Sequence, residues 1–375
     1  MSREGFSRLL EKLWSGTAAE GPAERMAFTL LIGLGAAYGV VQAMRARAYE
    51  RGWLNGWRAP CPVVSIGNLA AGGTGKTPLT LWLAQRSLAL GFSPAIVSRG
   101  YRQGSRRPVT VVSDGRGTRL DPPEAADEAA LLARRLPGVP VLTAPRRPLG
   151  MARAVAEFHA DLLLLDDGFQ HLPARRDLDL VLLDGNDPLG NGRVLPGGPL
   201  REFPSALRRA DGLILTRVAS PEAGEEAKRR LHALFPDKPV MLCQHRWTGW
   251  RRLGAGADGG NGEGAPFEGA ALAFCGLARP EEFRRSLEAR GVPLVGWIPL
   301  PDHHDYRREE VAAWSRQARS LGARGLICTE KDVVKLDPSW SDLPIHYPLL
   351  DLAFFEEPRW LLQRLQALAE ANLRS

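Results

Sequence analysis

The stretch VVSIGNLAAGGTGKTP, residues 63–78, decides how this chain of 375 residues folds. Its first four residues predict a buried strand, Val63–Ile66, and the helical run LTLWLAQRSL follows Pro78. A glycine-rich turn joins the two. Strand, glycine-rich turn and helix in this order are the setting of a phosphate-binding loop. The stretch therefore predicts a nucleoside triphosphate site in an α/β fold.

Each residue type in this loop has a physical role. Glycines let backbone N–H groups cradle phosphate oxygens, and the N-terminus of the following helix favours an anion. Lys76 is expected to reach the β- and γ-phosphates, while the hydroxyl of Thr77 is offered to Mg²⁺. The strict pattern has glycine where this chain has Ala70. The predicted nucleotide-binding residues are Ala70, Ala71, Gly72, Gly73, Thr74, Gly75, Lys76 and Thr77.

Further apolar runs alternate with helical stretches downstream of the loop. They are PAIVSRG (94–100), DLLLLDD (161–167), DLVLLDG (179–185) and GLILTRV (212–218). Such alternation predicts βαβ units, and near-continuous apolar strands indicate a parallel sheet covered on both faces. We expect a P-loop NTPase-type, mostly parallel sheet with helices on both faces, whose ligands bind at the carboxyl ends of the strands.

Acidic side chains follow two of these regions. Asp166 and Asp167 end an apolar strand, as the ligands of a Mg²⁺ beside a P-loop would. Glu202 ends the loop NGRVLPGGPLRE and is either a further ligand or an exposed charge. The predicted metal ligands are Thr77, Asp166, Asp167 and Glu202.

Two other polar clusters are ambiguous on local grounds. Asp127 and Glu128 open a helix, where acidic groups commonly only offset the helix dipole. The run Asp302-His303-His304-Asp305 fits a base pair, a metal site or a polar surface turn.

The N-terminal region has the pattern of a membrane-associated segment. Phe6, Leu9, Leu10, Leu13 and Trp14 make a short amphipathic stripe that suits a membrane surface. Residues 26–44 carry no charge over ~19 residues, which nearly matches the thickness of a bilayer core. Arginines follow, and no small-residue cleavage site is evident, so an uncleaved anchor is expected. The alternative is a buried helix of a soluble protein.

The length predicts about two domains. We expect a membrane-associated helical segment at 1–52, a P-loop kinase core at 53–240 and a smaller α/β lobe at 241–375, which contains a glycine-rich insertion at 254–264. A net charge of +7 favours an anionic partner. The scattered basic residues lack the aromatic interleaving of a nucleic-acid groove, so no nucleic acid is expected. The four cysteines stand alone and are expected to be buried apolar residues.

Several ordered motifs carry a family resemblance. GNLAAGGTGKTP, SRGY, DDGFQH, GNGRVLPGGPLRE, FCGLARPEEF, PDHHDY and TEKDVVKL occur in that order, up to about Leu336. The chain resembles the tetraacyldisaccharide 4'-kinases, the lipid A 4'-kinases of Gram-negative bacteria. Alanine in place of the first loop glycine is shared by that family.

The resemblance implies transfer of the γ-phosphoryl group of ATP, with Mg²⁺, to the 4'-hydroxyl of tetraacyldisaccharide 1-phosphate, giving lipid IVA. It implies an acylated disaccharide phosphate as the substrate, a membrane surface as the partner and the cytoplasmic face of the inner membrane as the location. No obligate protein partner is inferred. The implied catalytic residues are Asp127, His303 and Lys76, with Arg99 and Arg201 as anion contacts.

One further expectation concerns movement. The family usually has proline after the motif that matches Asp127-Glu128, where this chain has Ala129. With Asp127 and His303 expected in different lobes, closure of the lobes would assemble the base.

Two rival classes fit the sequence less well. A membrane-bound switch ATPase of the partitioning type has a signature lysine where this chain has Ala71. A GTPase metallochaperone needs a guanine motif late in the sheet, and the nearest candidate, Thr216-Arg217-Val218, lacks the aspartate.

Overall fold

The computed structural model describes residues 3–254 and 267–372. Its contacts divide the chain into two compact units, each assembled from separate segments. The first unit comprises Met1–Arg99, Arg146–Gln244 and Ala353–Ser375, and the second comprises Gly100–Pro145 and His245–Leu352.

This division differs from the predicted linear one. The chain leaves the first unit after Arg99 and returns to it at Arg146, so residues 100–145 belong with the C-terminal part of the sequence. The last segment, from Ala353, belongs again to the first unit. The predicted glycine-rich insertion, 254–264, lies outside the described residues except for Gly254.

The first unit contains a parallel sheet in the order β8-β7-β6-β1-β5-β2. Its strands are β1 (Val63–Asn68), β2 (Pro94–Ser98), β5 (Leu162–Asp166), β6 (Leu178–Asp184), β7 (Gly212–Thr216) and the start of β8 (Val240–Arg252). The first five confirm the five predicted apolar strands. Every residue of β1, β5 and β7 is buried, and because successive side chains point to opposite faces, both faces of the sheet are covered.

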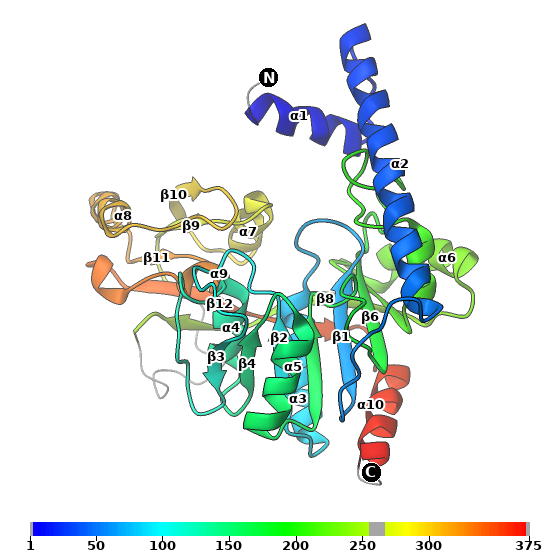
Figure 1. Ribbon diagram of the computed structural model, residues 1–375. Helices are drawn as coiled ribbons and strands as arrows, with labels where there is room; N and C mark the ends of the chain where they lie inside the picture. Colours follow the sequence, from blue (N-terminus) through cyan, green and yellow to red (C-terminus); the bar gives the residue numbers. More distant parts are fainter. Residues whose placement is uncertain (1–2, 255–266, 373–375) are drawn as a thin grey trace. The chain divides into compact units, whose positions relative to one another are not determined.

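Helices cover this sheet (Figure 1). They are α3 (Lys76–Ala89), α5 (Arg147–Phe158), α6 (Pro221–Leu234) and α10 (Arg359–Asn372), with a short 3₁₀ turn at Pro204–Arg209. Helices α3 and α5 pack on β1, β2 and β5, whereas α6 packs on β7. Trp360 of α10 lies against Gly212, where an added Cβ would come within 2.6 Å of its ring. The predicted mostly parallel sheet with helices on both faces is confirmed.

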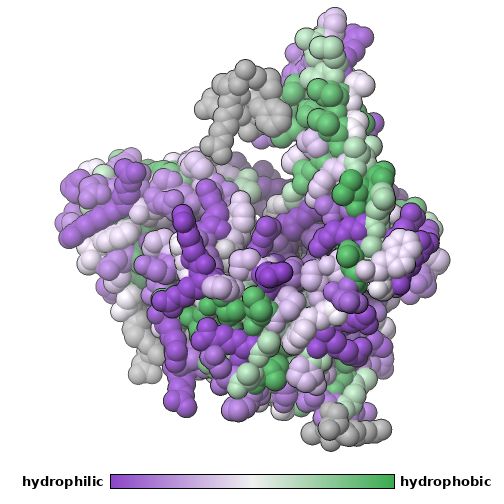
Figure 2. All heavy atoms as spheres, in the orientation of Figure 1, coloured by the Kyte–Doolittle hydropathy of each residue, from purple (hydrophilic) through white to green (hydrophobic). Residues whose placement is uncertain are grey.

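Two helices precede the sheet, α1 (Arg3–Trp14) and α2 (Pro22–Glu50). By length and composition, α2 is able to cross a membrane, and only 22% of its most apolar window is buried. Its exposed residues include Met26, Leu30, Leu34, Val41 and Met44. Figure 2 shows hydrophobic atoms along this helix. An exposed apolar face in a long helix is typical of contact with lipid or with another apolar surface.

The apolar stripe of α1 packs on α2. Leu9, Leu10, Leu13 and Trp14 form a cluster with Phe28, Leu31 and Ile32. The side chain of Phe6 lies outside the described residues. The stripe therefore packs against α2, whereas its sequence pattern predicted a place on a membrane surface.

Helix α2 is seated on the loop Asn191–Glu202 through small residues. A Cβ at Gly35 would lie 2.3 Å from the carbonyl oxygen of Val194, and one at Gly39 would lie 2.5 Å from the ring of Phe203. In addition, Trp14 Nε1 donates to the carbonyl of Pro196 at 3.0 Å. The glycines of α2 thus allow a helix–backbone approach that any side chain would block.

The second unit is also α/β. Its strands β9 (Ala271–Cys275), β10 (Leu294–Pro299), β11 (Gly325–Ile327) and β12 (Ile345–Phe354) pair in parallel in the order β10-β9-β11-β12. An antiparallel pair, β3 (Thr110–Asp114) and β4 (Pro140–Thr143), belongs to the same unit. Its helices are α4 (Asp127–Arg135), α7 (Pro280–Glu288), α8 (Arg308–Ser320) and the single turn α9 (Glu330–Val333), with a 3₁₀ turn at Pro338–Trp340. The predicted α/β second lobe is confirmed.

The four cysteines are buried and free, as predicted. Burial raises the pKa of Cys61 to about 11 and that of Cys243 to about 12. A buried thiol in apolar surroundings behaves as a small hydrophobic side chain.

Candidate functional site

The glycine-rich loop connects β1 to α3 in the first unit with the backbone that a P-loop requires. Gly72 and Gly75 have φ values of 107° and 85°, which side chains rarely tolerate. Asn68 Nδ2 donates to the carbonyls of Ala70 at 2.7 Å and Gly72 at 3.1 Å. These bonds hold two carbonyl groups of the loop, and the loop leads directly into the N-terminus of α3, the end of a helix that favours an anion.

Neighbouring elements hold the loop from outside. Thr216 at the end of β7 donates from Oγ1 to the carbonyl of Thr74 at 2.8 Å. Two backbone bonds join the phosphate loop to the loop Asn191–Glu202. The N–H of Ala71 donates to the carbonyl of Pro199 at 2.8 Å, and the N–H of Arg201 donates to the carbonyl of Leu69 at 2.8 Å. The phosphate loop is therefore fixed on both sides before any ligand binds.

Asp166 and Asp167 stand at the end of β5, as predicted, but in different environments. Asp166 is buried and accepts from Thr80 Oγ1 at 3.2 Å. Asp167 has a left-handed φ of 57° and lies 3.4 Å from Lys76 Nζ and 2.9 Å from Arg201 Nη1. Burial alone would raise the pKa of Asp167, but the charges of Lys76 and Arg201 outweigh it, so the pKa is lowered.

Arg147, the first residue of α5, is a member of this group that the sequence did not single out. It is buried, and its Nη2 donates to the carbonyl of Asp167 at 3.0 Å. Burial lowers the pKa of Arg147 to about 10; the charge of Asp167 opposes that shift, while Arg99 adds to it. Arg147 is thus a third candidate anion contact, besides the predicted Arg99 and Arg201. The sequence offers only a weak signal for Arg147, namely an arginine that opens a helical run after a short apolar strand.

The predicted metal ligands are not all alike in the structure. Glu202 is buried in a bidentate ion pair with Arg209, at 3.0 Å for both contacts. Among the described residues, no three His, Cys, Asp or Glu side chains come together as a metal site. A Mg²⁺ beside a P-loop needs only one or two protein oxygens, because phosphate and water supply the rest. All four predicted ligands, Thr77, Asp166, Asp167 and Glu202, therefore stay predictions, and two of them, Asp167 and Glu202, already pair with arginines.

The second unit brings Asp127 and His303 together. His303 Nδ1 lies 3.0 Å from Asp127 Oδ2, and Lys335 Nζ lies 3.3 Å from the same oxygen. The expectation that Asp127 and His303 come from different lobes is wrong, because the segment 100–145 belongs to the same unit as His303. The two side chains meet without any closure, so the reason for the closure hypothesis is removed.

The surroundings of Asp127 favour its charged form. Burial alone would raise its pKa, but the hydrogen bond with His303 and the charge of Lys335 outweigh burial, and the pKa is lowered. Asp127 is the first residue of α4, so the helix N-terminus adds to this preference.

The other members of the two ambiguous clusters have separate partners. His304 Nε2 lies 3.2 Å from Glu310 Oε2, at the start of α8. Asp302 and Glu128 lie 2.9 Å and 3.5 Å from Lys331 Nζ. Within the described part of the chain, these histidines and acids do not converge on a metal position.

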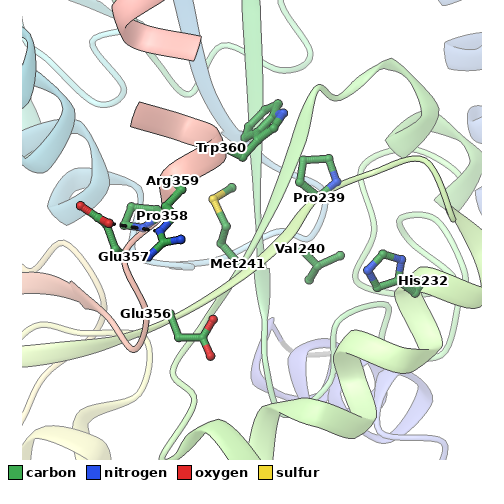
Figure 3. A pocket seen from close by; sticks show the side chains of 9 residues that line it. All are labelled: His232, Pro239, Val240, Met241, Glu356, Glu357, Pro358, Arg359 and Trp360. Carbon is green, nitrogen blue, oxygen red and sulfur yellow. Dashed lines mark hydrogen bonds and ion pairs between the residues drawn. The ribbon is translucent and has the colours of Figure 1, made fainter. Parts of the chain in front are cut away.

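A surface pocket of about 650 Å³ lies elsewhere in the first unit (Figure 3). Its lining is His232, Pro239, Val240, Met241, Glu356, Glu357, Pro358, Arg359 and Trp360. Within this lining, Arg359 Nε donates to Glu357 Oε2 at 3.4 Å, and both side chains are exposed. None of the predicted site residues lines the pocket, so we do not assign the chemistry to it.

Comparisons with known proteins point to one family. The model of the family described as tetraacyldisaccharide-1-P 4'-kinase matches residues 27–368. A tetraacyldisaccharide 4'-kinase of Anaeromyxobacter dehalogenans is 44% identical over 336 residues, covering 88% of this chain and 86% of that protein. One of Geobacter sulfurreducens is 38% identical over 354 residues, covering 94% and 96%.

A solved structure extends the likeness to three dimensions. It is described as the apo form of LpxK from Aquifex aeolicus in complex with ATP, and it superposes with a TM-score of 0.73 at 27% identity, covering 91% of this chain and 99% of that one. With the family model spanning most of the sequence and relatives near 40% identity along nearly their whole length, the chain belongs to the tetraacyldisaccharide-1-P 4'-kinase family.

Proposed function

We propose that this protein transfers the γ-phosphoryl group of ATP to the 4'-hydroxyl of a tetraacyldisaccharide 1-phosphate, which forms lipid IVA. The observation that carries the proposal is the phosphate loop of a family member: Gly72 and Gly75 are left-handed, α3 starts at Lys76, and Lys76 lies 3.4 Å from Asp167. Loop amides and a lysine provide the positive field that a transferring phosphoryl group requires.

The residues of the first unit have separate tasks in this proposal. Loop N–H groups and Lys76 bind the β- and γ-phosphates, and Arg147 and Arg201 add positive charge beside Asp167. Thr77 and Asp166 would hold Mg²⁺, which neutralises phosphate charge when bound. With ATP bound, Lys76 exchanges its contact with Asp167 for phosphate oxygens.

Asp127 of the second unit is proposed to accept the proton of the acceptor hydroxyl. The hydroxyl oxygen bonds to the γ-phosphorus, the bond to the β,γ-bridging oxygen breaks, and ADP leaves. An aspartate with a lowered pKa is ionised at neutral pH and able to accept that proton. Phosphoryl transfer passes through a loose transition state, so the base mainly has to be well positioned.

An acylated substrate calls for a membrane location. We place the protein at the cytoplasmic face of the inner membrane, with the exposed apolar residues of α2 in contact with lipid. Membrane fractions washed with high salt or with carbonate test this location. An enzyme released by salt alone would contradict a hydrophobic attachment.

The activity is tested with the full chain in detergent, labelled ATP and a tetraacyl disaccharide 1-phosphate. We expect wild type to phosphorylate the lipid, and Lys76→Ala and Asp127→Asn each to lose roughly 10²-fold or more in rate. Lys228→Ala and Glu226→Gln are matched controls, because each residue makes an exposed or partly exposed ion pair on α6, away from the proposed site residues. No labelled lipid from the wild type would refute the proposed function.

The metal assignment has a test of its own. We expect Mg²⁺ to strengthen ATP binding by the wild type and by Thr77→Ser, which keeps the hydroxyl, but much less by Thr77→Ala. Calorimetric titration with and without Mg²⁺ measures this difference. An equal effect of Mg²⁺ on all three proteins would remove Thr77 from the metal site.

A further inference from the structure

Helix α1 precedes the residues that the family model matches, 27–368. Its apolar side chains pack on α2, but its last turn also makes two hydrogen bonds that this packing does not require. Both bonds lead to the loop Asn191–Glu202, which holds the phosphate loop from outside. Helix α1 therefore has a link to the nucleotide site that the proposed function has not used.

The last turn of α1 contacts the loop Asn191–Glu202 at two points. Trp14 Nε1 donates to the carbonyl of Pro196 at 3.0 Å, and Asn191 Nδ2 donates to the carbonyl of Leu13 at 3.2 Å. The side chain of Leu13 is buried and that of Trp14 is partly buried. Hydrogen bonds that are shielded from water are stronger than exposed ones, so they fix the loop relative to α1.

The turn between α1 and α2 is closed by bonds of its own. Lys12 Nζ lies 2.7 Å from Glu20 Oε1 and 3.3 Å from Glu24 Oε1. Glu24 Oε2 accepts from the N–H of Glu20 at 2.6 Å, and the N–H of Thr17 donates to the carbonyl of Lys12 at 3.0 Å. Trp14 therefore reaches the loop from a defined position on the helix pair.

The loop Asn191–Glu202 is bonded across its own width. The N–H of Leu195 donates to the carbonyl of Leu200 at 2.7 Å, and the N–H of Gly198 donates to the carbonyl of Val194 at 3.1 Å. A segment with such cross-bonds opens and closes as one piece. A bond that holds one point of the loop thus limits movement at the other points.

The far side of the same loop contacts the nucleotide site. The carbonyl of Pro199 accepts from the N–H of Ala71, and the N–H of Arg201 donates to the carbonyl of Leu69, both at 2.8 Å. Arg201 also places Nη1 2.9 Å from Asp167 Oδ1. The path from α1 to the phosphate loop is therefore continuous and lies within the first unit.

Packing on α2 alone does not explain the choice of tryptophan at position 14. A phenylalanine would fill much of the same apolar contact, whereas only the indole supplies an N–H at its edge. Helix α2 supports the loop in a different way, because a Cβ at Gly197 would lie 2.8 Å from the Cα of Ile32. The loop is thus packed against α2 and hydrogen-bonded to α1.

We propose that Trp14 is a positioning residue for ATP binding. Its bond to Pro196 holds the loop Asn191–Glu202 in the conformation in which Pro199 bonds to Ala71, so the phosphate loop is ordered before ATP arrives. Helix α1 thereby adds to nucleotide affinity, while the exposed face of α2 provides the attachment to lipid. This inference rests on the proposed function only in taking the phosphate loop as the ATP site.

Calorimetric titration of the full chain in detergent with ATP and Mg²⁺ tests the proposal. Trp14→Phe keeps the ring and removes the donor. Losing one hydrogen bond that favours the binding-competent loop should raise the Kd for ATP by about 2–12-fold. In the kinase assay the KM for ATP should rise by a similar factor, and kcat should stay within about twofold, because the bond acts on binding before the chemical step.

A matched control removes a different indole. Trp53 follows the C-terminal end of α2 and is 71% exposed, so Trp53→Phe should leave the Kd for ATP near that of the wild type. A purely structural role of Trp14 would lower Tm without changing the Kd for ATP, and that result would overturn the proposal. Weaker attachment of Trp14→Phe to membranes with an unchanged Kd would also overturn it and would assign α1 to the lipid surface.

The reverse effect is measurable in the wild type. If the bond of Trp14 favours ATP binding, bound ATP must favour the bond of Trp14 in return. The chain has ten tryptophans, and Trp14→Phe, or Trp14→Tyr if the first variant does not fold, assigns the indole N–H signal of Trp14 in an NMR spectrum. Saturating ATP should slow hydrogen exchange at this N–H by about 2-fold or more and leave that of Trp53 unchanged.

An exchange rate at Trp14 that ATP does not alter would refute the coupling. A wild type that binds ATP but phosphorylates no lipid would instead refute the proposed function, and the results on ATP affinity and hydrogen exchange would still stand.

Discussion

Three glycines of α2 offer a test of how this helix is seated. Gly33 is exposed, and a Cβ added there would have no neighbouring atom within 4 Å, whereas a Cβ at Gly35 would lie 2.3 Å from the carbonyl oxygen of Val194 and 3.0 Å from the nitrogen of Gly197. Both obstacles are backbone atoms that cannot rotate away. The same substitution to alanine should therefore have opposite effects at two positions on one helix.

The magnitude follows from two terms. Alanine in place of glycine stabilises a helix interior by about 1 kcal/mol, and this gain is common to both positions. Forcing an extra methyl into a packed contact costs about 1–3 kcal/mol, and only Gly35→Ala incurs it. The difference between the two variants is thus about 1–3 kcal/mol, or roughly 2–12 °C in Tm for a unit of this size. Gly39→Ala should lie between them, because it meets the Phe203 ring, which is able to move.

Thermal unfolding of the three variants in one detergent measures the order. ATP affinity gives a second readout, because the loop that Gly35 touches also bonds to the phosphate loop, through the carbonyl of Pro199 and the N–H of Ala71. Gly35→Ala should weaken ATP binding and Gly33→Ala should not. If both variants raise Tm equally, α2 is not seated on Val194 and Gly197, and the reasoning fails.

Other predictions follow from buried groups. The native protein should not react with an aromatic disulfide reagent at pH 8, and the unfolded protein should expose four reactive thiols, because all four cysteines are buried and free. Asp332→Ala should lower the free energy of unfolding, measured with urea, by about 2 kcal/mol or more. The substitution leaves the buried Tyr306 hydroxyl and the Gly276 N–H without their acceptor. A smaller effect than that of Tyr306→Phe would contradict this. The pKa of Asp167 is lower in the folded protein than in the unfolded chain, where a carboxyl pKa is about 4. The ion pairs of Asp167 therefore stabilise the fold fully above that pH, and this stabilisation is lost as the pH falls through the lower pKa of the folded protein. The acid decline of Tm should be shallower in Asp167→Asn, and an identical slope would show that these ion pairs do not stabilise the fold.

The sheet of the first unit was predictable because its strands are buried on both faces. Each strand is a short apolar run without alternation, bounded by Gly, Pro or Asp. Few structures other than a buried strand produce that sequence pattern. Strand β8 lacks this pattern, because most of its thirteen residues are half-buried and polar side chains interrupt it, so no strand was expected there. The glycine-rich loop and the carboxylates after β5 were predictable for a related reason, since a strand end fixes which side chains meet there.

What the sequence could not place was the segment 100–145. Its membership of the second unit rests on contacts between residues far apart in the sequence, and charged pairs are among them. Helix α4 bears Asp127 at its start and Arg135 at its end, and α9 with the residues after it offers Lys335 and Glu330 to them. Arginine and aspartate on a helix surface usually mean only a solvated face, so neither pattern predicts its partner alone.

That pairing also explains why Asp127 and His303 meet within one unit. Arg134 adds a bond from Nη2 to the carbonyl of Val334 at 3.2 Å, so both ends of α4 are tied to the segment that carries Glu330 and Lys335. Any shift of α4 would separate Asp127 from Lys335 and Arg135 from Glu330 together, and two buried or half-buried ion pairs are costly to break. The charged form of Asp127 is therefore coupled to the folding of its own unit. We expect Arg135→Gln to lower Tm and, on the proposed role of Asp127 as the base, to move the acidic side of the pH–rate profile to higher pH.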